Sequence, residues 1–142
     1  TVLTAADVDA LHQAGGKLLV SPNIDAEVMR RAAIYGMVTM PGVFTPTEAF
    51  QAIRLGASAL KFFPASVLGP AGIAAMRAVL PAGTPVGAVG GVSDKDFSGY
   101  KTAGVSVFGL GSSLFKPGMG VAEVAARARA AASAWDATFG VP

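Results

Sequence analysis

Lys61 lies in the most apolar segment of the chain, residues 59–63, with hydrophobic residues on both sides. Side chains alternate between the two faces of an extended strand, so Lys61 shares one face with Ala59 and Phe63. Burial of an unpaired ammonium group is costly, and proteins relieve that cost by lowering the lysine pKa. The neutral amine that results can attack a ketone and form a Schiff base. A lysine here can also extend from the strand end to solvent, and the strand alone favours neither interpretation.

Two glycine-containing segments each follow a predicted strand. Gly90 and Gly91 follow one strand, and Gly111 and Ser112 follow the next. Glycine lets backbone N–H groups approach an anion closely, and each segment leads towards a helix start, so the two loops predict a phosphate site to which Ser112 adds a hydroxyl. The loops after the last two strands of a (β/α)₈ barrel commonly bind phosphate. Either segment alone is also typical of a tight turn, and neither is a P-loop or a dinucleotide fingerprint.

The remaining candidate groups are few. Segment 41–46 begins with Pro41 and is rigid, so we expect it to shape one wall of a site, although it also fits a simple strand end and helix start. Cysteine is absent and His12, the only histidine, has no acidic or hydroxyl partner at a useful spacing. We therefore expect a surface histidine and no metal site built on histidine or cysteine. No cofactor is expected either. No pair of carboxylates follows a strand, so no general acid/base is evident. Arg127 and Arg129, on the predicted last helix, are interpreted as part of a solvated helix face.

Short β-type runs alternate with helical segments along the chain. Glycines 36, 56 and 104 stand where helices should end, and three pairs are typical of helix N-caps: Thr4 with Asp7, Thr45 with Glu48, and Ser93 with Asp96. The patterns predict strands over 18–20, 37–40, 59–63, 86–89 and 105–110, and helices over 5–14, 24–36, 46–55, 70–80, 94–103 and 121–139. The strands are nearly continuous apolar runs, which is expected where both faces of a parallel sheet are buried.

Length and composition narrow the class of protein. The chain has 142 residues, 52% of them hydrophobic, which predicts one domain over 1–142. The net charge of +2 comes with no run of like charges, so a nucleic-acid partner is not expected. No apolar stretch reaches the roughly 18 residues that span a bilayer, so we expect no membrane partner. A cytoplasmic enzyme fits the absence of cysteine.

Five βα units are compatible with two α/β architectures. A doubly wound sheet is complete at this length, whereas a (β/α)₈ TIM barrel needs eight units. Because the predicted elements begin with a helix and no strand before it, we expect a barrel of which the chain covers about five units, with the N-terminal strands absent.

Several motifs together resemble a known enzyme family. They are Val20-Ser21-Pro22-Asn23, Pro41-Gly42 with Thr45-Pro46-Thr47-Glu48, Lys61-Phe62-Phe63-Pro64-Ala65, Gly90-Gly91 and Gly111-Ser112. In order and spacing they resemble the class I KDPG/KDPGal aldolases along the whole chain, and Val89 and segment 20–32 resemble the branch that acts on 2-dehydro-3-deoxy-6-phosphogalactonate. Gluconate-type relatives usually carry Thr at the position of Val89.

The resemblance implies a metal-free lyase of carbohydrate metabolism on a (β/α)₈ barrel, assembled as a homotrimer. It implies cleavage of the phosphorylated keto-sugar acid to pyruvate and D-glyceraldehyde 3-phosphate. Lys61 matches the Schiff-base lysine and Phe63 an aromatic residue beside it, while Thr1 matches a threonine that contacts the keto-acid end. Pro41 and Val89 fall among the substrate-binding positions. Gly90, Gly91, Gly111 and Ser112 fall on the phosphate loops.

The chain departs from the family pattern at its start. Family members carry two earlier strands that supply an arginine and the general acid/base glutamate, and we expect the chain to be the C-terminal two thirds of such a barrel. Three alternatives stay open: a gluconate-type aldolase, a phosphate-binding barrel isomerase or synthase without a Schiff base, and a chain that only binds or assembles.

Overall fold

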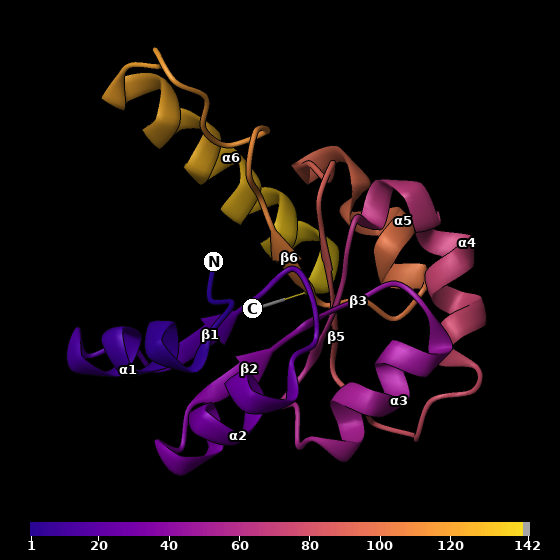
Figure 1. The fold of residues 1–142 in the computed structure, drawn as a ribbon. Coiled ribbons are helices and arrows are strands. Elements are labelled where there is room, and N and C mark those ends of the chain that lie inside the picture. Colours follow the sequence, from indigo (N-terminus) through magenta and orange to yellow (C-terminus); the bar gives the residue numbers. More distant parts are fainter. Residues whose placement is uncertain (141–142) are drawn as a thin grey trace.

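The chain forms an α/β fold in which strands alternate with helices, and the computed structural model describes residues 1–140 (Figure 1). The elements in order are α1 (Ala5–Gln13), β1 (Leu18–Val20), α2 (Ala26–Ile34), β2 (Val38–Met40), β3 (Gly42–Val43), α3 (Pro46–Arg54), β4 (Leu60–Phe62), α4 (Ala65–Arg77), β5 (Val86–Val89), the 3₁₀ turn η1 (Asp94–Asp96), α5 (Phe97–Thr102), β6 (Val107–Gly109) and α6 (Val121–Phe139). No helix in this part of the chain is long and apolar enough to cross a membrane.

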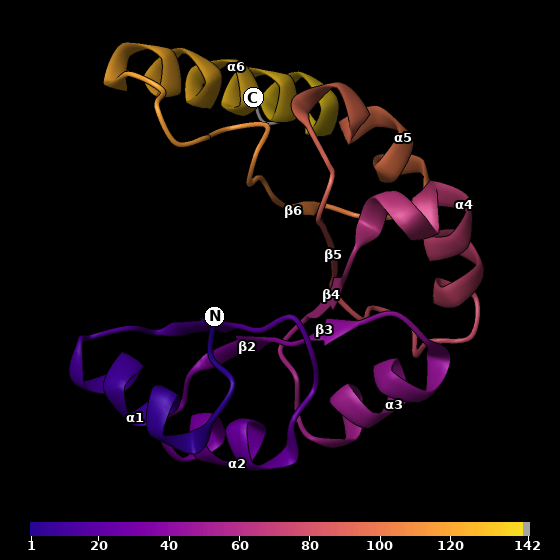
Figure 2. The same ribbon diagram turned by 45° about the horizontal axis from the view of Figure 1, so that its top comes forward.

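The strands pair in parallel throughout. β1 pairs with β2, and β3, β4, β5 and β6 follow one another in a second ladder. Pro41 separates β2 from β3, and its carbonyl accepts the Lys61 N–H at 3.0 Å, so the chain passes from one ladder to the other at this residue. Figure 2 shows the result as an open arc with the strands on the inner side and the helices on the outer side. Among residues 1–140 no pairing joins β1 to β6, so closure into a barrel is not seen.

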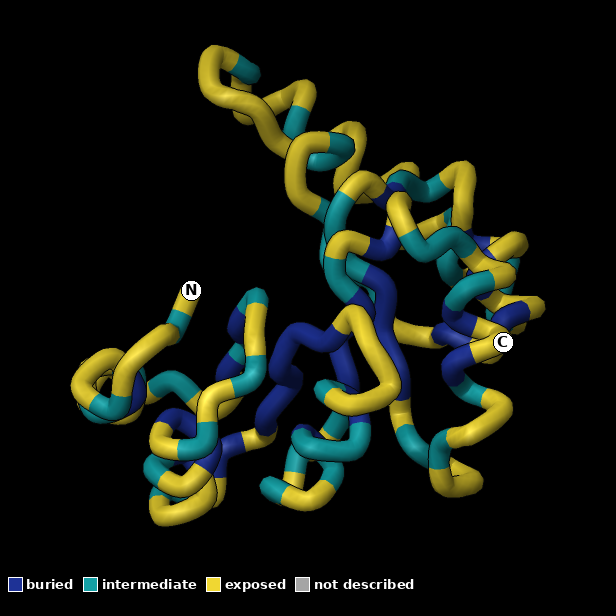
Figure 3. The backbone as a smooth tube through the Cα atoms, turned by 45° about the vertical axis from the view of Figure 1, so that its right-hand side comes forward, coloured by how far each residue is buried: buried dark blue, intermediate teal, exposed yellow. Residues whose placement is uncertain are grey.

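The core lies between the outer face of the strands and the helices. Leu60 and Phe62 of β4 are almost fully buried there with Val86 and Ala88 of β5, and α3, α4 and α5 cover them. A second cluster holds Leu19 of β1 against α1 and α2. Burial of one large apolar side chain stabilises the fold by about 1.5–3 kcal/mol. Figure 3 shows the buried segments gathered at the strands, whereas α6 has no buried residue.

The inner face of the arc is more exposed than the sequence predicted. Leu18, Val38 and Val107 are 56%, 52% and 44% exposed. Leu19 follows Leu18, Phe108 follows Val107, and both pack against helices, so alternation turns Leu18 and Val107 to the concave side. Val38 is in register with Leu18 and shares its face. The expectation that both faces of every strand are buried is therefore wrong for these positions, because no described residue covers them.

The predicted helix signals are confirmed, and the boundaries shift by a few residues. All three capping boxes form, and glycines 36, 56 and 104 have φ of 61°, 79° and 76°. The helix expected over 70–80 instead runs over Ala65–Arg77. Gly69, at φ 65° and ψ 170°, interrupts it, so Pro70 starts a second helical segment as its fixed φ favours. The strand expected over 105–110 is confined to β6.

The cap of α3 leads to a test of pH dependence. The Glu48 carboxylate accepts hydrogen bonds from Phe44 N–H at 2.8 Å, Thr45 N–H at 2.8 Å and the Thr45 hydroxyl at 2.9 Å. These bonds hold the Glu48 pKa below its ordinary value of 4.5, and the bond from the Phe44 N–H has the largest effect. A lowered folded-state pKa stabilises the fold above the unfolded pKa, and that contribution is lost as pH falls through the folded pKa.

We expect Glu48→Gln to lower the free energy of unfolding by roughly 0.5–1 kcal/mol at neutral pH, because charge-assisted bonds become neutral ones. The difference from the wild type should shrink below pH 4.5 as Glu48 is protonated. Urea unfolding across pH measures both. Glu27→Gln is the control, since Glu27 lies in the first turn of α2, where Asp25 makes the cap bonds. An equal effect of both substitutions would assign the stability to the helix dipole instead.

Candidate functional site

Lys61 occupies the centre of β4 and is buried. Its exposed fraction is 7%, so the side chain does not extend to solvent as one interpretation of the sequence allowed. Leu60 and Phe62 face the helices, which turns Lys61 to the concave side of the arc. Its register partners on the two adjacent strands are both glycines, Gly42 and Gly87. An added Cβ at Gly87 would collide with the terminal methyl group of Met40 and lie 3.0 Å from the Val107 carbonyl oxygen, so the close packing here favours glycine.

The Lys61 amine contacts a backbone carbonyl group and an aromatic ring. Its Nζ donates a hydrogen bond to the Ser21 carbonyl at 3.2 Å and lies 4.4 Å from the centroid of the Phe63 ring. The contact with Phe63 agrees with the shared strand face that the sequence predicted. Loss of hydration in the buried position lowers the Lys61 pKa below its ordinary value of 10.5. No carboxylate in the described chain pairs with the amine, so the arrangement favours a neutral nucleophile.

The Ser21-Pro22-Asn23 turn places the carbonyl that accepts from Lys61. Ser21 is buried, and its hydroxyl donates to the Asn23 carbonyl at 2.8 Å, which holds the turn closed. The turn lies directly against Gly42, where an added Cβ would collide with the Pro22 carbonyl group. Glycine is therefore required at this point, and the turn can approach the lysine because β3 has no side chain there. The sequence singled out this turn as a family motif but gave no sign of its contact with Lys61.

Three of the predicted substrate-binding residues, Pro41, Phe63 and Val89, lie in or directly beside the strands, whereas Thr1 lies before α1. Pro41 is fully buried beside β3, and the Phe63 ring lies against Gly90, where an added Cβ would be 3.1 Å from the ring. Val89 is in register with Gly109, and an added Cβ there would be 2.7 Å from a Val89 methyl group. Thr1 is exposed in the segment before α1, and no hydrogen bond joins it to these residues. Its role stays a prediction.

The two predicted phosphate loops meet. The Ser113 hydroxyl donates to the Val92 carbonyl at 2.9 Å, which joins the loop after β6 to the loop after β5. Gly90 and Gly91 have φ of 93° and 72°, a conformation that favours glycine. Leu114 and Phe115 both donate their N–H to the Gly111 carbonyl at 2.9 Å. Within residues 1–140 the Ser112 and Ser113 N–H groups have no protein acceptor, so they are available to an anion.

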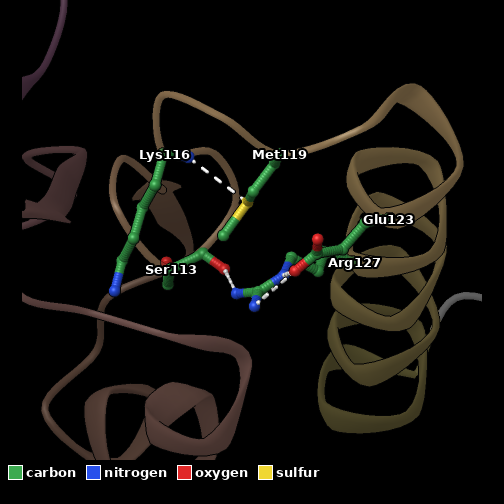
Figure 4. Close-up of polar contacts among 5 residues, drawn as sticks. All are labelled: Ser113, Lys116, Met119, Glu123 and Arg127. Carbon is green, nitrogen blue, oxygen red and sulfur yellow. Dashed lines mark hydrogen bonds and ion pairs between the residues drawn. The ribbon is translucent and has the colours of Figure 1, made fainter.

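Arg127 corrects an expectation from the sequence. It is not simply part of a solvated face, because its Nη1 donates to the Ser113 carbonyl at 3.0 Å (Figure 4). His12 is exposed as expected, yet it has a partner that the spacing did not show, since its ring stacks on Tyr35 at 3.9 Å between centroids. Both contacts join residues from different elements, and no local signal marks them.

In the part of the chain that the structure describes, no three His, Asp or Glu side chains lie close enough together to hold a metal ion. The groups gathered around Lys61 are a carbonyl, an aromatic ring and two glycines. They suit covalent chemistry at the amine.

Comparison with known proteins assigns the chain to a family. The family model described as "KDPG and KHG aldolase" matches residues 1–119. The chain belongs to this aldolase family.

Several relatives support the assignment. A probable 2-dehydro-3-deoxy-6-phosphogalactonate aldolase of Rhizobium meliloti (strain 1021) is 59% identical over 99% of the chain. The 2-dehydro-3-deoxy-6-phosphogalactonate aldolase of Escherichia coli (strain K12) is 47% identical over 95% of it. The chain spans 66% of the length of each, just under two thirds. A solved structure titled "Native KDPGal structure" superposes with a TM-score of 0.95 at 45% identity and covers 99% of this chain and 68% of its own.

The contact between Gly42 and the Pro22 carbonyl can be tested directly. We expect Gly42→Ala to lower the free energy of unfolding by about 1–3 kcal/mol, because the added methyl group forces the turn or β3 to move. Gly72→Ala, in α4, is the control, since its Cβ would make an ordinary 3.4 Å contact with Leu68 and alanine favours the helix. Urea unfolding followed by circular dichroism compares them. Equal stability of Gly42→Ala and the wild type would contradict the close packing of the turn.

Proposed function

We propose that this aldolase-family chain carries the Schiff-base lysine of a class I aldolase that cleaves 2-dehydro-3-deoxy-6-phosphogalactonate to pyruvate and D-glyceraldehyde 3-phosphate. The observation that carries the proposal is the buried Lys61 amine, with its lowered pKa, at the centre of β4. The names of the two relatives from Rhizobium meliloti and Escherichia coli support the substrate. Val89 offers the substrate no hydroxyl, which favours the galacto over the gluco epimer. Comparison of kcat/KM for the two epimers distinguishes this substrate from the gluconate-type alternative.

The proposed reaction begins at the Lys61 amine. Its lone pair attacks C2 of the keto acid, and loss of water gives a protonated imine. The 4-hydroxyl then loses its proton, the C3–C4 bond breaks, and its electron pair moves towards the iminium nitrogen to form an enamine. D-Glyceraldehyde 3-phosphate leaves, C3 of the enamine takes up a proton, and water hydrolyses the imine to release pyruvate and the free amine. The Ser21 carbonyl, which accepts from Nζ at 3.2 Å, is placed to accept the N–H of the protonated imine.

The proposed phosphate site holds the other end of the substrate. Gly90 and Gly91 contribute one loop and Gly111 and Ser112 the other, and the bond between Ser113 and Val92 keeps the loops together. The Phe63 ring contacts both the Lys61 amine and Gly90, which supports a substrate that reaches from the loops to the lysine. Fixing both ends of the substrate converts binding energy into orientation. Thr1 completes the proposed contacts at the keto-acid end, and Pro41 contributes to one wall of the proposed site.

The proposal extends to the barrel architecture and the oligomeric state of the protein. We infer that residues 1–142 are a single domain that covers about five βα units of a (β/α)₈ barrel, and that the protein is a cytoplasmic homotrimer that needs no metal or cofactor. The open arc of parallel strands with helices outside it supports the barrel, and the family resemblance supports the trimer. Light scattering of the purified protein measures the oligomeric state.

Trapping with pyruvate and borohydride tests the proposed function. We expect one reduced pyruvate to become attached to Lys61 because borohydride converts the imine to a stable secondary amine, and peptide mass spectrometry locates it. Lys61→Met should abolish the attachment. Lys17→Met should retain it, since Lys17 is exposed. A folded wild-type protein that leaves Lys61 unmodified would contradict the Schiff-base mechanism and favour a phosphate-binding barrel of another class.

A further inference from the structure

Arg127 connects the last helix to the proposed phosphate site. Its guanidinium reaches two acceptors at once: Nη1 donates to the Ser113 carbonyl at 3.0 Å, and Nη2 and Nε donate to Glu123 Oε1 at 3.0 and 3.3 Å (Figure 4). Glu123 and Arg127 lie one turn apart on α6, so the ion pair fixes the guanidinium relative to the helix. Arg127 is thereby directed at the loop after β6.

Ser113 is the residue through which this contact reaches both loops. Its hydroxyl bonds to Val92 in the loop after β5, and its carbonyl bonds to Arg127 on α6. The residues between β6 and α6 form neither strand nor helix, so few backbone bonds fix this segment. The free N–H groups of Ser112 and Ser113 lie next to the carbonyl that Arg127 holds.

We propose that Arg127 is a positioning residue for phosphate binding, acting through the Ser113 carbonyl on the backbone N–H groups of Ser112 and Ser113. The inference rests on the proposed function, because it assumes that the two glycine loops bind phosphate. Arg127 itself does not contact the phosphate in this account. It holds the loop in the conformation in which the N–H groups face the anion, with Glu123 holding Arg127 in turn.

Geometry, and not charge, is the basis of this role. The Glu123 carboxylate balances the charge of Arg127 locally, which reduces the attraction of an anion through space. The planar guanidinium serves two acceptors in fixed directions, which the single ammonium of a lysine does not reproduce. The positioning role therefore predicts that lysine cannot replace Arg127, whereas a role in charge alone predicts that it can.

Three variants and a matched control separate these accounts, with inorganic phosphate as the probe in titration calorimetry. We expect Arg127→Met and Arg127→Lys each to weaken phosphate binding roughly fivefold or more, the effect of one lost hydrogen bond. Glu123→Gln should also weaken binding, although it makes the protein more positive. Arg129→Met, which removes the same charge from an exposed position on the same helix, should leave binding within about twofold of the wild type.

Kinetics and pyruvate trapping complete the test. The Arg127 variants should raise KM for the phosphorylated substrate, while pyruvate trapping at Lys61 stays at the wild-type level. Wild-type phosphate affinity in Arg127→Lys, or tighter binding in Glu123→Gln, would overturn the positioning role. If Arg127→Met fails to fold, as thermal denaturation would show, Arg127→Lys and Glu123→Gln still decide. A wild-type protein that neither traps pyruvate nor binds phosphate would overturn the proposed function together with this role, whereas failure of the variants alone overturns only the role.

Discussion

The structure around the site depends on the burial of one amine in an apolar strand. Lys61 has almost no contact with solvent, and no carboxylate in the described chain compensates its charge. The Ser21 carbonyl and the Phe63 ring favour the ammonium form, but they do not replace the lost hydration, which sets the direction of the pKa shift. The residues in register with Lys61 on the two adjacent strands are both glycines, so neither adds a side chain beside the amine.

The helices and loops contribute to the site by fixing its two ends. At the amine, the Pro22 turn is held against Gly42, so the acceptor for Nζ is fixed by backbone packing. At the far end, α6 is joined to the loop after β6 through Arg127, and that loop is joined to the next through Ser113. The rigidity of the first end comes from close contact, and that of the second from hydrogen bonds at the surface. Substitution at the first end should therefore act through steric collision, whereas substitution at the second should act through the loss of hydrogen bonds.

The sequence predicts what depends on neighbouring residues and misses what depends on the path of the chain. The capping boxes, the left-handed glycines and the shared face of Lys61 and Phe63 follow from local stereochemistry. The bond from Lys61 to Ser21 spans 40 residues and ends on a backbone carbonyl, which every residue has, so no side-chain pattern announces it. Arg127 looked like a solvated residue because its acceptor, Ser113, lies in an irregular segment. The exposure of Leu18 and Val38 depends on what covers the inner face, which strand composition does not specify.

Titration of the Lys61 amine measures whether burial lowers its pKa. Heteronuclear NMR of protein labelled with ¹³C at the lysine ε position, with Lys61→Met used to assign the resonance, gives the pKa of this group in the folded state. We expect a value below the ordinary 10.5, because desolvation outweighs the carbonyl and the aromatic ring. A value at or above 10.5 would contradict it, since the amine would then be held as an ammonium ion and burial would not be what prepares it for reaction.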